Sequence, residues 1–280
     1  MQLFYKYLPP ERISYFDDER LRFSPPSALN DPYECIPKLP DELEHIVLDT
    51  IFEICETGSA NYERSDELKY SILNAVTEIC KTGIDIKATK QRVAMYKEDI
   101  SKLVDDFNSE ILKGMNENIG ILSLSKRWNS SLMWSHYALS HQGICLGFNS
   151  QHDFFKYPSE TTNRSGFGIG SVRYSLERPN LRGIDNSNAL FTKSVDWKYE
   201  DEVRAICLLK DANKTIKAEP FNIALFKIPH QAVKEVIVGM RVDDRTYQFA
   251  KKFAMQNSIP LYRTMLSNRT YDLQRYQIDI

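Results

Sequence analysis

The sequence predicts an α+β protein whose β core is mixed or antiparallel and is interrupted by a block of helices. Strand-like runs lie before and after residues 40–118, whereas apolar residues inside this block recur at helical spacing. A chain of 280 residues is long enough for one large domain with a sizeable insertion. We therefore expect a single domain over residues 1–280, with a three-helix insertion at residues 40–118.

The composition is that of an ordinary globular protein, with 42% apolar and 11% aromatic residues. The net charge of −2 reflects 36 basic and 38 acidic side chains, so no overall field attracts nucleic acid or membrane. The five cysteines lack CxxC spacing, which favours reduced thiols in the cytoplasm. Since no signal peptide and no apolar run of about 20 residues is evident, we expect a cytoplasmic protein without a membrane partner.

The N-terminal segment reads as a strand, a short helix and a rigid loop. Aromatic residues over Leu3–Tyr7 are typical of a strand, and a Pro-Pro pair ends it. A short helix over Glu11–Arg20 and an extended segment over Leu21–Ser24 are expected to follow. The prolines of Ser24–Glu34 predict a rigid loop.

The block from Pro40 to Met115 has a helical pattern throughout. Its longest predicted helix covers roughly Asp85–Met115, where apolar residues recur every three or four positions. Gly58 and Gly83 lie where two earlier helices should end. We expect the charged faces of these helices to be solvated, and a lid or a partner surface is the alternative.

The most informative stretch begins with a strand over Ile119–Ser125. Alternation along this strand places Ser123 and Ser125 on one face, which is unusual for a segment that only fills a core. A helix is expected next, because Asn129 and Ser130 are favoured N-cap residues and apolar residues follow at helical spacing.

The rest of the chain reads as mostly β with short helices. The predicted strands are Ile144–Phe148, Ser171–Ser175, Glu202–Leu209, Phe221–Phe226, Val233–Gly239 and a closing strand Ile259–Met265, and the predicted helices are Gln151–Tyr157 and Asp243–Asn257. The glycine-rich Asn163–Gly170 lacks the strand-turn-helix context of a dinucleotide fingerprint and is expected to be a loop. The tail after Asn268 is expected to be loosely held, although its tyrosines suggest docking.

The strongest chemical candidate is the run Tyr199–Arg204. Read as the entry to a strand, it places Glu200 and Glu202 on one face, with Arg204 beside them. Two carboxylates so close disfavour joint ionisation unless a cation or an ordered substrate compensates. The apolar residues that follow argue against an edge strand with exposed acids, so we expect this polar entrance to border a cleft.

The residues alone leave two functional hypotheses open. A site that combined His136 with Asp196, Glu200 and Glu202 would suit a metal-dependent nuclease or hydrolase, although a lone helical histidine is most often structural. HExxH, paired CxxC, Walker-type and GxSxG motifs are absent. In the second of these hypotheses the chain is a non-enzymatic interaction module, in which the helical insertion binds a partner and the polar residues are structural.

Several short motifs together resemble a widespread bacterial family of unknown function. They are a Lys-Tyr opening, an Asn-Asp-Pro loop, a Met-Trp-Ser-His-Tyr-Ala helix and a Trp-x-Tyr-Glu-x-Glu-x-Arg block, which begin here at Lys6, Asn30, Met133 and Trp197. The resemblance covers most of the chain outside the insertion. It implies no established activity.

A more distant resemblance is to ADP-ribosyltransferases. In that family a basic residue or histidine in the first strand is followed by Ser-x-Ser on a second strand and by Glu-x-Glu at the entry to a later one. The matching positions here are Lys6, Ser123, Ser125, Glu200 and Glu202. The fold implied is an ADP-ribosyltransferase-like β core that contains the helical insertion.

The resemblance to ADP-ribosyltransferases implies an enzyme that consumes NAD as a substrate. Glu202 would stabilise an oxocarbenium-like ribosyl transition state, Glu200 would orient or deprotonate the acceptor, and Ser123 would hold Glu202. The residues expected to bind NAD are Tyr5, Lys6, Tyr7, Ser125, Trp134, His136, Tyr137 and Arg204. ADP-ribose would pass to a protein or nucleic-acid acceptor, or to water, as in a toxin or a phage-defence effector.

Overall fold

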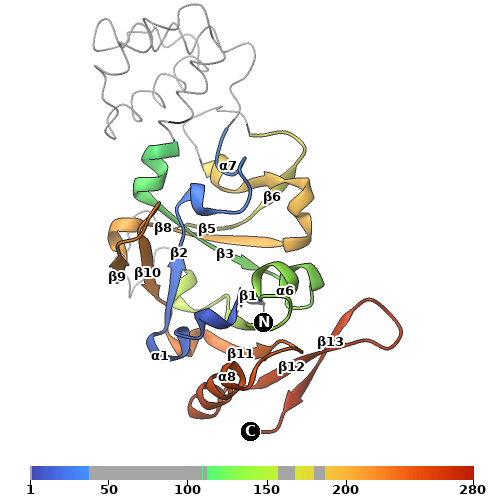
Figure 1. Cartoon of the computed structure of the whole chain (residues 1–280). Helices are drawn as coiled ribbons and strands as arrows, with labels where there is room; N and C mark the ends of the chain where they lie inside the picture. The colour runs from blue at the N-terminus through green and yellow to red at the C-terminus, as the bar shows by residue number, and fades with distance from the viewer. Residues whose placement is uncertain (1, 38–108, 110–111, 157–167, 180–186) are drawn as a thin grey trace, which may run out of the picture. The chain divides into compact units, whose positions relative to one another are not determined.

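The computed structural model describes residues 2–37, 109, 112–156, 168–179 and 187–280 (Figure 1). The chain divides into two compact units. The first consists of Met1–Ser24, Ile119–Val172 and Asp196–Ile280, and the second of Pro25–Asn118 and Arg173–Val195. Most of the expected insertion at residues 40–118 lies outside the described residues.

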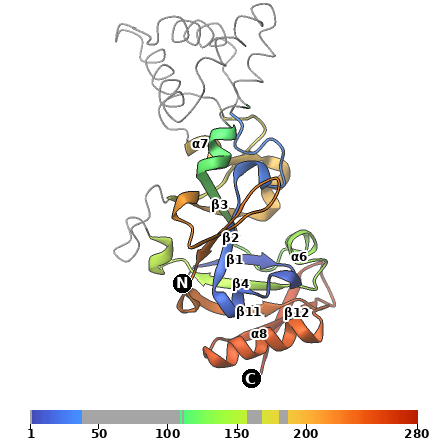
Figure 2. The same cartoon turned by 60° about the vertical axis from the view of Figure 1, so that its left-hand side comes forward.

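The first unit is built on an eight-stranded sheet, so the expected α+β class with a mixed sheet is confirmed. The strands are β1 (Leu3–Leu8), β3 (Ile119–Ser125), β4 (Ile144–Asn149), β5 (Gly168–Ser171), β8 (Glu202–Leu208), β11 (Val233–Val238), β12 (Leu261–Leu266) and β13 (Leu273–Ile278), in the order β13-β12-β11-β4-β1-β3-β8-β5. Within this eight-stranded sheet, β11 and β12 are the one parallel pair of neighbours. The crossover helix α8 (Asp244–Gln256) connects these two strands and packs against both of them (Figure 2). The other neighbouring pairs are antiparallel.

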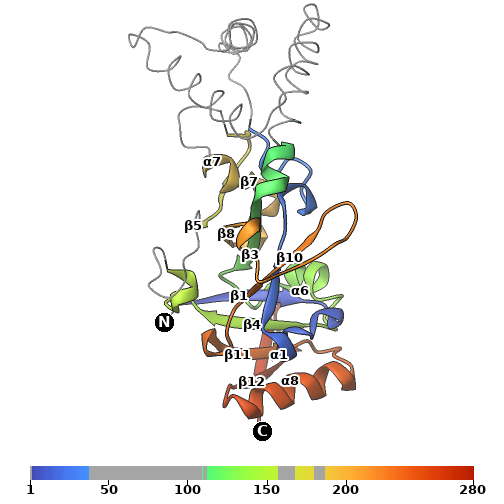
Figure 3. The same ribbon diagram turned by 90° about the vertical axis from the view of Figure 1, so that its left-hand side faces the viewer.

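A three-stranded sheet in the same unit pairs β2 (Arg20–Phe23), β10 (Ile223–Lys227) and β9 (Lys214–Ile216). It joins the large sheet through an isolated bridge between Ser24 and Ile121. The short helix α1 (Tyr15–Asp18) contacts α8 (Figure 3). In this contact the ring centroids of Phe16 and Phe253 lie 4.8 Å apart.

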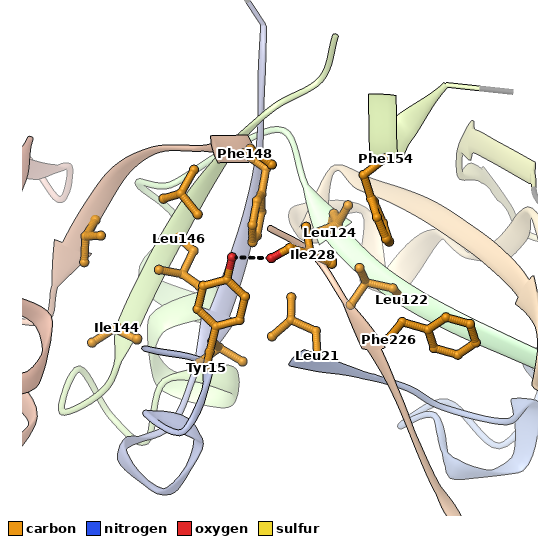
Figure 4. Packing of buried hydrophobic residues seen from close by; sticks show 14 of the residues in the cluster. Tyr15, Leu21, Leu122, Leu124, Ile144, Leu146, Phe148, Phe154, Phe226 and Ile228 are labelled. Atoms are coloured by element: carbon orange, nitrogen blue, oxygen red, sulfur yellow. Dashed lines mark hydrogen bonds between the residues drawn. The ribbon is translucent and has the colours of Figure 1, made fainter. Parts of the chain in front are cut away.

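The larger hydrophobic core lies on one face of the sheet, where side chains from both sheets meet (Figure 4). Leu124 comes from β3, Phe148 from β4 and Phe226 from β10. The fully buried Tyr15 donates its hydroxyl hydrogen to the carbonyl oxygen of Ile228 at 2.9 Å, so its polar atom is satisfied. Each large apolar side chain buried in this way contributes roughly 1.5–3 kcal/mol.

The alternation predicted for the two central strands is confirmed. The larger core contains Leu122 and Leu124 from β3, together with Val203, Ala205 and Cys207 from β8. Because successive side chains of a strand point to opposite faces, the polar residues of these two strands lie on the other face.

A smaller core covers that other face under helix α6 (Ser131–Tyr137). Ser130 caps this helix by accepting from the backbone N–H of Met133, so the predicted N-cap is confirmed. Trp134 and Cys145 are both fully buried here. Helix α6 is therefore held on this face of the sheet by a core of its own.

The second unit is small in its described part. It contains helical residues 112–118, α7 (Ser187–Leu190), and β6 (Arg173–Ser175) paired in parallel with β7 (Thr192–Ser194). Lys193 and Glu34 form a buried ion pair at 3.3 Å.

Some expected elements differ from the structure. The tail after Asn268 is not loose, because β13 pairs with β12 over its whole length, and Ile259–Met265 is therefore not the closing strand. Gly168 to Gly170 were expected in a loop but begin β5, since the backbone of a glycine-rich edge strand pairs whatever its side chains. A helix was expected over Gln151–Tyr157, and the described part of this segment, residues 151–156, forms only a 3-10 turn at Asp153–Phe155.

Candidate functional site

Three segments that are far apart in the sequence lie on adjacent strands. β3 lies between β1 and β8 in the sheet. Tyr5 pairs with Ser125, and Ser125 pairs with Glu202, so these three residues form a row across three strands. The fold therefore places two of the motif positions, Ser125 and Glu202, opposite each other, and Lys6 follows Tyr5 on β1.

Glu202 and Arg204 form a buried ion pair at the start of β8. The Arg204 Nε donates to Glu202 Oε1 at 2.9 Å, and Nη2 donates to Oε2 at 3.1 Å. Their side chains are only 2% and 0% exposed. β8 lies between β3 and β5, so an edge strand with exposed acids is excluded. The guanidinium fixes the orientation of this carboxylate with two parallel hydrogen bonds.

Glu200 is buried but lies outside the strand. It ends a 3-10 helix (Val195–Glu200), and Asp201 then adopts a left-handed conformation with φ 43°. Strand alternation therefore does not place Glu200 and Glu202 on one face, as the sequence reading assumed, because the pleat begins only at Glu202. The hydroxyl of Tyr137 donates to Glu200 Oε1 at 2.5 Å, and Glu200 is 3% exposed.

Ser125, rather than Ser123, lies opposite Glu202. The cross-strand neighbour of Ser123 is Arg204. The Ser125 hydroxyl donates to the backbone carbonyl of Glu200 at 2.6 Å. The expected role of Ser123 in holding Glu202 thus has no support in the register of the strands, and the serine that joins β3 to the acidic segment is Ser125.

The loop that follows Ser125 is bonded to the acidic segment. The backbone N–H of Arg127 donates to the Ser125 hydroxyl at 3.0 Å. The backbone N–H of Lys126 donates to the carbonyl of Asp201 at 2.9 Å. Together with the Ser125 to Glu200 bond, these contacts fix the backbone on both sides of Asp201.

Lys6 extends its amine from β1 toward the same cluster. Its Nζ donates to the carbonyl oxygen of Ser123 at 2.9 Å. Burial lowers the pKa of Lys6 to about 8, and the charges of Glu202 and Glu200 partly oppose this shift. Arg12 lowers it further. The amine is therefore bonded to the backbone of β3, the strand that pairs with the start of β8.

Most aromatic residues expected to stack on NAD are buried in the smaller core. Tyr5 and Tyr7 are 8% and 4% exposed, and Trp134 is fully buried with its Nε1 donating to the carbonyl of Trp128 at 2.7 Å. The Tyr7 hydroxyl donates to the carbonyl of Arg127 at 2.7 Å. Because no face of Trp134 reaches solvent, a stacking role for this residue is wrong, and the core positions of the two tyrosines make one unfavourable for them.

His136 and Tyr137 differ from those residues because they reach the surface of α6. His136 is exposed, and its Nδ1 lies 3.0 Å from the hydroxyl of Tyr199. Tyr137 is partly exposed and bonds Glu200 directly. Tyr137 therefore contacts both solvent and the buried Glu200 carboxylate, and His136 lies next to it at the surface.

A second ion pair between a glutamate and an arginine lies on the same face of the sheet and was not predicted from the sequence. The guanidinium of Arg275 on β13 donates to both carboxylate oxygens of Glu235 on β11, at 2.5 and 3.1 Å. Gly147 lies between Glu235 and Tyr5 in the strand register. A Cβ at Gly147 would lie 2.6 Å from Glu235 Cγ and 3.1 Å from Tyr5 Cε1, so glycine lets these two side chains approach over β4.

Glu235 lies in the same row of cross-strand neighbours as Glu202. The register aligns Glu235, Gly147, Tyr5, Ser125 and Glu202. Burial and the nearby Glu235 raise the pKa of Tyr5 well above its ordinary value. The isolated Glu235 in an apolar strand was the one sequence signal that could have revealed this pair.

The described residues contain no group of three His, Cys, Asp or Glu side chains suited to a metal ion. The geometry therefore does not favour a metal site built from His136, Asp196, Glu200 and Glu202. Within the described part of the chain, no helix combines the length and apolar character that a membrane crossing requires.

Comparison with known proteins bears on the segment that carries α6 and the two glutamates. No curated protein and no solved structure matches the chain. The comparisons therefore show no similarity to ADP-ribosyltransferases. Residues 133–205 match the family described as "Protein of unknown function (DUF2971)", which confirms over this segment the expected resemblance to an uncharacterised family.

Proposed function

We propose that this chain cleaves the nicotinamide–ribose bond of NAD and transfers ADP-ribose to a macromolecular acceptor or to water. The observation that carries the proposal is the pairing of Ser125 with Glu202 on adjacent strands, together with the bond of the Lys6 amine to the backbone carbonyl of Ser123 on the same strand as Ser125. These are the elements that the resemblance to ADP-ribosyltransferases requires in one place.

The chemistry follows from charge. Loss of nicotinamide leaves positive charge on the ribose, and a fixed carboxylate in a site of low dielectric stabilises that charge. Glu202 would supply the carboxylate, and its two bonds from Arg204 would hold it without reorganisation. Lys6 keeps the cluster close to neutral before the substrate binds.

Glu200 would act on the acceptor. Its bond from Tyr137 links it to the side of α6 where His136 is exposed, so an acceptor would approach from there. A hydroxyl, amine or water held at this position would pass its proton to Glu200 as it attacks the ribosyl carbon.

The test measures nicotinamide released from NAD by the purified protein, with and without cell lysate. Glu202→Gln should reduce release by at least about 10²-fold, a loss of about 2.7 kcal/mol of transition-state stabilisation. Glu11→Gln, which changes an exposed glutamate in the same unit, should leave the rate unchanged. Dependence on lysate would indicate transfer rather than hydrolysis.

Two controls keep the test decisive. Circular dichroism must show that Glu202→Gln is folded, and Glu200→Gln provides a second variant that leaves the Arg204 pair intact. No release by folded wild-type protein would refute the proposal. A divalent-metal requirement lost in His136→Ala would favour the hydrolase reading, and a stable complex unaffected by Glu202→Gln would favour an interaction module.

A further inference from the structure

Arg275, on the edge strand β13, lies close to two aromatic rings. Its guanidinium carbon is 4.6 Å from the ring centroid of Trp128 and 4.2 Å from that of Tyr262. The same group donates both bonds to Glu235. The guanidinium is therefore restrained by two aromatic rings and by a carboxylate that accepts two of its hydrogen bonds.

Trp128 links Arg275 to the loop beside the candidate site. It follows Lys126 and Arg127, whose backbone N–H groups bond the Asp201 carbonyl and the Ser125 hydroxyl. Its own carbonyl accepts from the indole of Trp134 in α6. A side chain that fixes Trp128 therefore fixes the loop that carries those bonds.

A second route runs through Glu235. This carboxylate contacts Tyr5 over Gly147, and Tyr5 is the cross-strand neighbour of Ser125. Arg275 thus restrains both sides of Ser125: the loop after it through Trp128, and the strand beside it through Glu235.

We infer that Arg275 is a positioning residue that orders the loop 126–128 and thereby sets the position of Glu200. It touches neither glutamate of the candidate site in the contacts described above, and it acts through Trp128 and Glu235. Its effect on catalysis rests on the proposed function, whereas its effect on the loop does not.

The test compares Arg275→Met, Arg275→Lys and Arg269→Met in the full chain. Methionine keeps an apolar stem and removes the forked donor, and lysine keeps the charge but cannot bond both oxygens. Arg269 is exposed in the turn before β13, so Arg269→Met is the matched control. Circular dichroism establishes that each variant is folded.

The first readout is hydrogen exchange at the backbone N–H groups of Lys126 and Arg127. Arg275→Met should accelerate their exchange by about tenfold or more, because the loop that carries these N–H groups is no longer held against its acceptors. Exchange in the centres of β4 and β11 should not change. Arg275→Lys should give an intermediate rate, and Arg269→Met should match wild type.

The second readout separates kcat from KM for nicotinamide release. Arg275→Met should lower kcat at least about fivefold with KM within twofold, because the acceptor-activating group is misplaced while binding contacts remain. Unchanged exchange at Lys126 and Arg127 would overturn the inference whatever the activity. Faster exchange with unchanged kcat would make Arg275 a structural residue only. If wild type releases no nicotinamide, the proposed function fails and the exchange rates alone decide the role of Arg275 in the loop.

Discussion

Replacement of Arg204 by methionine should be among the most destabilising single changes in the first unit. The substitution removes the guanidinium and leaves the Glu202 carboxylate in a place where only 2% of its side chain reaches water. An ion without its partner in such a place loses solvation and gains no compensating bond.

The structure sets the magnitude. Both oxygens of Glu202 lose a charge-assisted donor, at 2.9 and 3.1 Å, and removal of one partner of a buried pair costs about 3–5 kcal/mol. The matched control is Arg20→Met, because Arg20 pairs with Asp18 at 3.5 Å and the two side chains are 31% and 32% exposed. That exposed pair should cost less than about 1 kcal/mol.

Urea unfolding followed by circular dichroism measures both free energies. Adding Glu202→Leu to Arg204→Met should recover most of the lost stability, since the double variant buries no unpaired charge. A loss below about 1 kcal/mol for Arg204→Met, or a double variant as unstable as the single one, would refute the reasoning.

Three further outcomes are expected. Gly147→Ala should lower the free energy of unfolding by about 1–3 kcal/mol because its methyl would lie 2.6 Å from a neighbouring side-chain carbon, whereas Gly168→Ala, which meets nothing within 4 Å, should be near neutral. Tyr137→Phe should cost about 1–3 kcal/mol and slow nicotinamide release, since Glu200 loses a donor at 2.5 Å, and urea unfolding with the release assay checks both. The folded pKa of Lys6, about 8, lies below its ordinary value of 10.5, so Lys6 opposes folding at low pH and this opposition is relieved between these two values. The difference in unfolding free energy between wild type and Lys6→Met should therefore change across that window by up to about 1.4 kcal/mol per pH unit, and a constant difference would contradict the shift.

The strands that carry the site were predictable because their patterns are local. Alternation in Ile119–Ser125 and Glu202–Leu208 placed the apolar residues on one face, and the core confirms it. Ser130 was recognisable as an N-cap from its side chain and its position before an apolar run.

The finer geometry depended on features that no local pattern carries. The left-handed backbone at Asp201 breaks the alternation just before β8, and a non-glycine residue gives no sign of it. Which serine lies opposite Glu202 depends on strand register, since the two serines are alike in sequence and only pairing distinguishes them.

The role of the C-terminal strand was missed for a related reason. Arg275 meets Glu235 across the intervening β12, so the contact joins residues that are distant in the chain and separated by a strand. Trp128 gave no signal either, because a tryptophan in a polar turn is as readily exposed as it is bound to a cation.

The central place of β1 has a consequence for how the protein is made. β1 pairs with β3 and β4, which begin at Ile119 and Ile144, so during synthesis β1 waits for partners that are more than a hundred residues later. At about 5–20 residues per second this wait lasts several seconds, during which β1 is an unpaired aromatic strand. Arg275 emerges later still. The motif residues Lys6, Ser125 and Glu202 can therefore come together only after synthesis has passed Glu202.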